Sequence, residues 1–338
     1  MSTKMAMGSF KSVAVLASLA LLPLGACAMD EADPELEEAE HGGGPDEPEL
    51  FLSGLQGPQG STIGPDGKLY VTEGRTGTVV RIDKNNGSRS TYLSGLPQQI
   101  PSVGIGGPVD VAFLGNTAYV LVTLVGSDVG GTSAVGIYRR NSSTSSTLIA
   151  DLGAFSIANP PATPFFIPSG VHFAIEAYKG TLLVTDGHHN RVLRVTTSGS
   201  ISIVKSFDNI VPTGIETAAS AVFMAQAGPV PHEPANGKVV SFIPGLAPVL
   251  PITSGAALAV DVEFGDGSLF VLSQGFFAPG TPEGGPAQPN TGKLFRIRTN
   301  GTLSTVADEL NQPTSMEFFG DDAYIVTLGG EIWTVDVD

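Results

Sequence analysis

The side chains best suited to chemistry recur at one position of a repeated sequence pattern. In successive repeats this position holds Thr62, Ala112, His172, Glu216, Glu263 and Glu317. Burying a carboxylate without a partner costs on the order of several kcal/mol unless it is protonated or hydrogen-bonded. These side chains therefore either line a wet channel or form a coupled polar cluster. As a site, His172 with Glu216 and Glu317 would bind a metal ion or transfer protons; as structure, the ionisable groups would hydrogen-bond between repeats.

Two aspartates form a second candidate pair. Asp110 and Asp261 lie in the second and fifth repeats, at a position where the other repeats carry Gly or Ser. If six repeats close into a ring, these two repeats lie opposite each other, so both side chains would face the mouth of a central channel. They would then bind a cation or a polar ligand, or accept backbone N–H groups from a neighbouring repeat.

The adjacent pair His188 and His189 is a weaker candidate. Neighbouring residues on one turn seldom bind the same metal ion with good geometry. The segment Asp186–Arg191 also matches a turn of NHL-type repeats, in which the aspartate braces the arginine. We therefore expect a structural role here. The chain has no nucleophile elbow, phosphate-binding loop or dinucleotide fingerprint.

The elements that must position these residues follow from the repeat itself. A Gly-containing turn followed by an apolar–aromatic–apolar strand is clearest at residues 64–71 and 264–271, and weaker copies centre on Tyr119, Leu183, Phe223 and Tyr324. A pattern that recurs at these intervals along the chain indicates a closed array of similar units. Asn-Gly and Asp-Gly turns between short strands predict four antiparallel strands in each unit. The fold class is therefore all-β, a six-bladed β-propeller.

The two ends of the folded region predict how the ring closes. The last repeat stops after a third strand at residues 331–335, whereas the folded region opens with Phe51–Leu55. This opening segment matches the fourth strand of the first full repeat, Tyr92–Leu96. We expect it to complete the last blade, which leaves no long free strand edge.

Residues 1–27 predict an export signal. Lys4 and Lys11 accompany an apolar run, residues 13–22, that is too short to span a bilayer. The run is followed by Leu24-Gly25-Ala26-Cys27, which is similar to the bacterial lipobox, whose cysteine is acylated. The alternative is ordinary signal cleavage beside this cysteine. Cys27 is the only cysteine, so no intrachain disulfide can form.

Residues 28–50 are acidic and rich in Gly and Pro, which predicts a disordered tether before a propeller of residues 51–338. Together with Cys27, the tether predicts a lipid-anchored protein of the periplasm or cell surface, or otherwise a secreted one. A lipid anchor would be its only contact with the membrane. The net charge of −16 and the lack of a basic stripe exclude nucleic acid as a partner.

The order of the repeats resembles the ScyD/ScyE family of secreted six-bladed propellers, which is related to NHL-repeat and TolB-like propellers. The residues that carry the resemblance, within about 51–338, are Gly57–Gly60, Thr72–Gly74, Val211–Gly214, Val260–Phe264 and Gln312–Ser315. The resemblance implies the fold and export. It implies no established catalytic activity.

The calcium-dependent lactonase and phosphotriesterase propellers of similar shape bind their metal through Glu, Asn and Asp at the starts of the inner strands. In this chain that position holds Gln59, Val109, Ser169, Thr213, Val260 and Thr314. Calcium prefers six to eight oxygen ligands, several of them charged. The usual ligand set is therefore missing, and we expect no cofactor, with a divalent cation such as calcium as the alternative.

Two insertions, residues 156–168 and 274–290, each carry a Phe-Phe pair, and both are expected at one rim of the ring. Ordered loops with exposed aromatic side chains often form contact surfaces. The sequence therefore favours a monomeric binding or scaffold protein over an enzyme, with a small molecule or a protein bound at this rim, and leaves the presence of an activity open. The alternatives are a calcium-type hydrolase or lactonase acting in the channel and a quinoprotein-like dehydrogenase, although the basic and aromatic residues that would hold a quinone cofactor are not evident.

Overall fold

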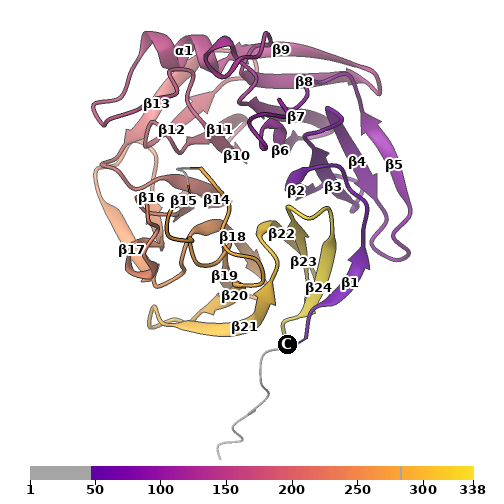
Figure 1. Ribbon diagram of the computed structural model, residues 1–338, viewed down its shortest axis with the longest axis vertical. Coiled ribbons are helices and arrows are strands. Elements are labelled where there is room, and N and C mark those ends of the chain that lie inside the picture. Colours follow the sequence, from indigo (N-terminus) through magenta and orange to yellow (C-terminus); the bar gives the residue numbers. More distant parts are fainter. Residues whose placement is uncertain (1–46, 282–283) are drawn as a thin grey trace, which may run out of the picture. The chain divides into compact units, whose positions relative to one another are not determined.

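Each repeat folds into a four-stranded antiparallel sheet, because short apolar strands alternate with turns that reverse the chain. Six such sheets form a ring, with the first strand of each repeat nearest its axis (Figure 1). The prediction of a six-bladed β-propeller is confirmed. This computed structural model describes residues 47–281 and 284–338, so the predicted signal segment, Cys27 and most of the predicted tether lie outside the described residues.

The strands of the first three blades follow the chain in order. Blade 1 contains β2 (Pro58–Ile63), β3 (Leu69–Glu73), β4 (Thr78–Ile82) and β5 (Arg89–Leu93). Blade 2 contains β6 (Gly107–Leu114), β7 (Thr117–Thr123), β8 (Gly136–Ser142) and β9 (Ser145–Asp151). Blade 3 contains β10 (His172–Tyr178), β11 (Thr181–Asp186), β12 (Arg191–Val195) and β13 (Ile201–Ser206).

Blades 4 and 5 also follow the chain in order, whereas the strands of blade 6 come from both ends of the chain. Blade 4 contains β14 (Pro212–Ala218), β15 (Ala221–Gln226), β16 (Lys238–Phe242) and β17 (Val249–Ser254). Blade 5 contains β18 (Ala259–Gly265), β19 (Ser268–Ser273), β20 (Gly292–Ile297) and β21 (Leu303–Leu310). Blade 6 contains β22 (Pro313–Phe319), β23 (Asp322–Thr327), β24 (Ile332–Asp336) and β1 (Glu49–Leu52).

The N-terminal strand β1 closes the ring, as the sequence predicted. It pairs antiparallel with β24, with Leu50 opposite Trp333 and Leu52 opposite Ile332 (Figure 1). The backbone N–H of Leu55 then donates to the carbonyl of Gly330 at 3.0 Å. The strand begins two residues earlier than the expected start of the propeller, because Glu49 already pairs with β24.

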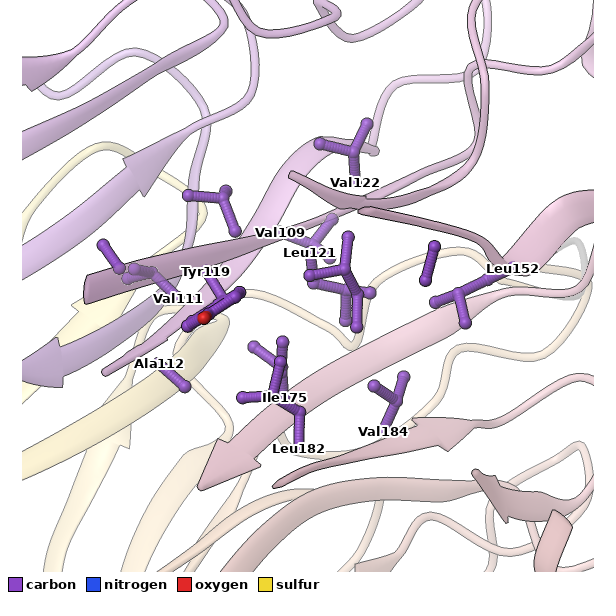
Figure 2. Packing of buried hydrophobic residues seen from close by; sticks show 14 of the residues in the cluster. Val109, Val111, Ala112, Tyr119, Leu121, Val122, Leu152, Ile175, Leu182 and Val184 are labelled. Carbon is purple, nitrogen blue, oxygen red and sulfur yellow. The ribbon is translucent and has the colours of Figure 1, made fainter. Parts of the chain in front are cut away.

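Apolar side chains fill the spaces between neighbouring blades. Figure 2 shows one such region, where Val111 and Leu121 of blade 2 lie near Ile175, Leu182 and Val184 of blade 3. All five side chains are buried. Each sheet therefore buries its apolar face against the next blade.

Helical structure is confined to the connections. The single α-helix of the described residues is α1 (Leu152–Ala158), and two short 3₁₀ helices are η1 (Ser127–Val129) and η2 (Pro234–Asn236). The Asp151 side chain caps α1 by accepting the backbone N–H of Ala154 at 2.7 Å. No helix within the described part of the chain is long and apolar enough to cross a membrane.

All six inner strands share one irregularity that sets which residues face the channel. Near its start each inner strand shifts register against the second strand of its blade. Beyond the shift, the residues at the equivalent position are Thr62, Ala112, Glu176, Glu216, Glu263 and Glu317. A one-residue slip would turn every following side chain to the other face.

Candidate functional site

A cavity of about 350 Å³ lies where the inner strands begin. Its rim is formed by apolar side chains of the connecting loops, among them Val103, Ile105, Val129, Phe166, Val230 and Leu328. Its inner wall contains carboxyl groups, namely Asp110, Glu176, Asp261, Glu263 and Glu317. Among its described lining residues there is no lysine or arginine. The site is therefore apolar at the mouth and acidic inside.

The structure corrects the predicted ring of ionisable residues in blade 3. Glu176, not His172, is equivalent to Glu216 there, because Glu176 pairs with Leu183 as Glu216 pairs with Phe223. The sequence prediction took residues 168–170 as the entry to the inner strand. These residues form a turn instead, and β10 begins only at His172.

The same register shift affects the strand-start position. Phe173, rather than Ser169, occupies it in blade 3. The missed Glu176 had a signal in the sequence, because Ile175-Glu176 repeats Ile215-Glu216 of blade 4. No carboxylate stands at the corrected strand-start position in any blade.

Four glutamates therefore form one carboxyl ring: Glu176, Glu216, Glu263 and Glu317. Burial first, and then the neighbouring Glu216, raise the pKa of Glu176 to about 8. Burial first, and then the other carboxyls, hold the pKa values of Glu263 and Glu317 well above the usual range. Burial also raises the pKa of Glu216, against the lowering effect of its interaction with the Glu263 side chain. The ring therefore retains protons near neutral pH.

The carboxyl ring does not form a ready-made metal site. Within residues 47–281 and 284–338, no three or more His, Cys, Asp or Glu side chains are grouped so as to hold a metal ion. Glu176 also has a partner in the next blade, since the hydroxyl of Thr217 donates to its Oε1 at 3.3 Å. The ring can accept or release protons, and it can accept hydrogen bonds from a ligand.

Asp110 and Asp261 join neighbouring blades. Oδ2 of Asp110 accepts the backbone N–H of Ile175 in blade 3 at 2.8 Å, and Oδ2 of Asp261 accepts that of Met316 in blade 6 at 2.9 Å. Each Oδ1 accepts the N–H of the next residue in its own strand. Burial raises the pKa of Asp261 to about 7. Of the two interpretations that the sequence allowed, the geometry matches the structural one.

Replacing Asp261 by alanine is therefore expected to destabilise the propeller. The buried N–H of Met316 would lose its acceptor, which costs about 1–3 kcal/mol of the free energy of unfolding. Urea denaturation at neutral pH measures this loss. Asp261→Asn is the matched control, because an amide oxygen can still accept one of the two bonds, so it should lose less. Equal stability of Asp261→Ala and the wild type would contradict this role.

The segment Asp186–Arg191 has the structural role expected from the sequence. The buried guanidinium of Arg191 donates from Nε to Oδ2 of Asp186 at 3.1 Å, and its other nitrogens reach Asn159 O and Ser156 Oγ. Nε2 of His188 accepts the backbone N–H groups of Phe166 and Ile167 at 2.8 and 3.0 Å. These contacts hold the first insertion against blade 3.

Both insertions border the same cavity, as predicted. Phe166 and Ile167 come from the first, and Gln274 and Gly284–Pro286 from the second. The Phe166 ring is 60% exposed and packs edge-on against His188, with 4.3 Å between ring centroids. The side-chain amide of Gln274 donates to Pro313 O and accepts the N–H of Ala287, which ties the two ends of the second insertion together and to blade 6. The rim is therefore held in place by hydrogen bonds.

His172 lies apart from the carboxyl ring and belongs to the wall of the cavity. Its side chain is fully buried beside Asp186. Burial lowers the pKa of His172 to about 4, so its imidazole is neutral at pH 7. The register shift places His172 at a different level of its strand from Glu216 and Glu317, so it is not a member of their ring. A joint site of the three residues stays a prediction.

Solved structures with the same fold include several enzymes. The chain matches the PQQ-bound form of an aldose sugar dehydrogenase from Streptomyces coelicolor with a TM-score of 0.60 and 14% identity, covering 87% of this chain and 100% of that chain. It matches a gluconolactonase from Xanthomonas campestris with a TM-score of 0.59 and 11% identity, covering 87% and 97%. It also matches a virginiamycin B lyase from Staphylococcus aureus with a TM-score of 0.54 and 15% identity, covering 86% of this chain and 100% of that chain.

At these identities the likeness shows the propeller fold alone. No protein-family model and no curated protein sequence matches the chain. The chemistry of the site must therefore be argued from its own residues.

Proposed function

We propose that this protein is an exported ligand-binding propeller that takes a small, largely apolar molecule, neutral or positively charged, at the mouth of its channel. One observation carries the proposal: the cavity of about 350 Å³ has an apolar rim, carboxyls inside and no cationic side chain in its described lining. Cavities of this size with mostly apolar walls and a few convergent polar groups are typical of small-molecule sites.

The charge of the lining limits the class of ligand. An anion would lose its hydration without gaining a cationic partner, and it would approach the carboxyls of Asp261, Glu263 and Glu317. PQQ carries several carboxylates, so this site does not fit that cofactor. A cation or a neutral hydrogen-bond donor would instead find acceptors.

The same proposal includes three further points: membership of the ScyD/ScyE family, an N-terminal export signal and a lipid anchor on Cys27. A binding role outside the cytoplasm agrees with a single propeller that follows an acidic segment. Labelling of the expressing cells with a radioactive fatty acid tests the anchor, and Cys27→Ser should abolish the label. Labelling that persists in Cys27→Ser would overturn this part of the proposal.

The charge preference is tested with two probes of equal size. We expect 2-naphthylmethylamine, a cation, to bind and 2-naphthoate, an anion, to bind at least tenfold more weakly, a difference of about 1.4 kcal/mol. Naphthalene fluorescence follows both titrations at pH 7. Glu317→Gln should weaken binding of the amine, because a bound ammonium group favours the ionised form of Glu317, and it should leave the anion unchanged or slightly improved. Preference for the anion, or binding of neither probe, would contradict the proposed function.

A metal-dependent hydrolase or lactonase is the second candidate, and the carboxyl ring is the observation that favours it. The strand-start position, where related enzymes carry their calcium ligands, holds no carboxylate in this chain. Thermal unfolding of the metal-stripped protein with and without about 1 mM calcium tests this candidate. A site with a dissociation constant near 10 μM would add about 2.7 kcal/mol, and Glu317→Gln would have to abolish that gain.

A further inference from the structure

One polar side chain in the wall of the cavity has no partner. The imidazole of His172 is 1% exposed, and neither Nδ1 nor Nε2 has a hydrogen-bond partner within the described protein. Leaving a buried polar group unpaired costs free energy, because its lost hydration is not replaced by a hydrogen bond. In the free protein, the ring nitrogens of His172 therefore form no hydrogen bond that would offset the cost of burying them.

Its neighbours cannot satisfy it. The nearest acceptor, Oδ2 of Asp186, lies 3.8 Å from Nε2, beyond hydrogen-bond distance. That oxygen is already bound to Nε of Arg191 at 3.1 Å, and Oδ1 accepts the backbone N–H groups of Val171 and His189. The Asp186 carboxylate is thus committed to holding the turn.

The other histidines near this site are different. His188 and His189 both form hydrogen bonds through their ring nitrogens, to the backbone of residues 166 and 167. They act as braces of the first insertion. Among the described residues that line the cavity, His172 alone combines full burial with two unused ring nitrogens.

We infer that His172 recognises an uncharged hydroxyl or amide group on a ligand in the channel mouth. This inference rests on the proposed function and specifies the polar group of its ligand. A neutral imidazole offers one N–H donor and one acceptor nitrogen. A hydroxyl or an amide can pair with either atom, and the apolar rim would cover the rest of the molecule.

The test compares 2-naphthol with 2-methylnaphthalene, which has the same shape and no hydroxyl. Fluorescence titration of the full chain at pH 7 is expected to show 2-naphthol binding about two- to tenfold more tightly, the range for one neutral hydrogen bond. His172→Leu should remove this preference and leave binding of 2-methylnaphthalene nearly unchanged. His172→Gln, which keeps a donor and an acceptor, should restore part of it.

His189→Leu is the matched control, because His189 is buried beside the same Asp186 but does not line the cavity and uses its ring nitrogens for Ile167 O and Arg191. It should lower the unfolding temperature without removing the preference for the hydroxyl. His172→Leu should be as stable as the wild type or more stable, because it breaks no hydrogen bond.

The outcomes separate this inference from the proposed function. Equal binding of both probes to the wild type would overturn the inference alone, because the apolar cavity would bind without help from His172. A preference that persists in His172→Leu would do the same. Failure of both probes to bind would overturn the proposed function and the inference with it. A marked loss of stability in His172→Leu would show that the histidine is a structural group.

Discussion

Deletion of residues 47–55 is expected to abolish cooperative folding of the propeller. The deletion removes β1 and leaves β24 as an open edge in a blade of three strands. It also removes Leu55, which is buried in an apolar cluster with side chains of blades 1 and 6, including Leu69, Val71 and Ile332. Phe51 packs edge-on against Tyr324, with ring centroids 5.1 Å apart, so this contact is lost as well.

Loss of Leu55 alone should cost about 2–5 kcal/mol, and the unpaired strand edge adds to this. That sum is a large part of the roughly 5–15 kcal/mol that stabilises most domains. Circular dichroism and thermal unfolding measure the effect, which we expect as aggregation or loss of a sharp transition.

A single-residue control accompanies this deletion. Leu50→Ser lies in the same strand, but its side chain is 52% exposed, so its stability should match the wild type within about 0.5 kcal/mol. A synthetic peptide of residues 47–56 added to the deleted protein should restore part of the transition. A deletion variant that unfolds as sharply and at the same temperature as the wild type would show that ring closure does not depend on β1.

The second large effect is a loss of stability as the pH rises. Glu176, Glu263 and Glu317 have folded-state pKa values above those of an unfolded chain. The folded state therefore binds more protons than the unfolded state, and stability falls as the pH increases. The stability that these protonated carboxyls contribute is fully present below about pH 4.5. It is lost as the pH rises through their folded-state pKa values, which are about 7 for Asp261 and about 8 for Glu176.

The size of the effect follows from the shifts. One pKa unit corresponds to about 1.4 kcal/mol. Because the glutamates are half-buried and keep contact with the channel, we expect only part of the full shifts, roughly 2–5 kcal/mol in total between about pH 5 and pH 9. For a domain of this size that lowers the unfolding temperature by roughly 5–15 °C.

Glutamine variants separate the ring from the general charge of this acidic chain. Glu263→Gln and Glu317→Gln should flatten the pH dependence and raise stability at pH 9, because each removes one charge from the ring. Asp321→Asn, on an exposed turn, removes the same charge from the surface and should leave the slope unchanged. Stability that rises between pH 5 and pH 9 would contradict the raised pKa values.

The sequence by itself determined the fold class, the number of blades and the closing strand. Turn signals such as Gly64–Gly67 and the short strands after them are local, and their repetition leaves few ways to bury every apolar face. The Asp186–Arg191 brace was predicted for the same reason, since both partners lie in one turn.

Only the tertiary structure decided which side chains meet in the channel. The number of residues in the turn before β10 sets the register of blade 3, and the sequence pattern alone placed His172 where Glu176 belongs. The bonds from Asp110 to Ile175 and from Asp261 to Met316 likewise join residues of different blades. Strand signals act over a few residues, whereas register and contacts between blades depend on how separate sheets pack, and this packing places an unpaired His172 in the wall of the site.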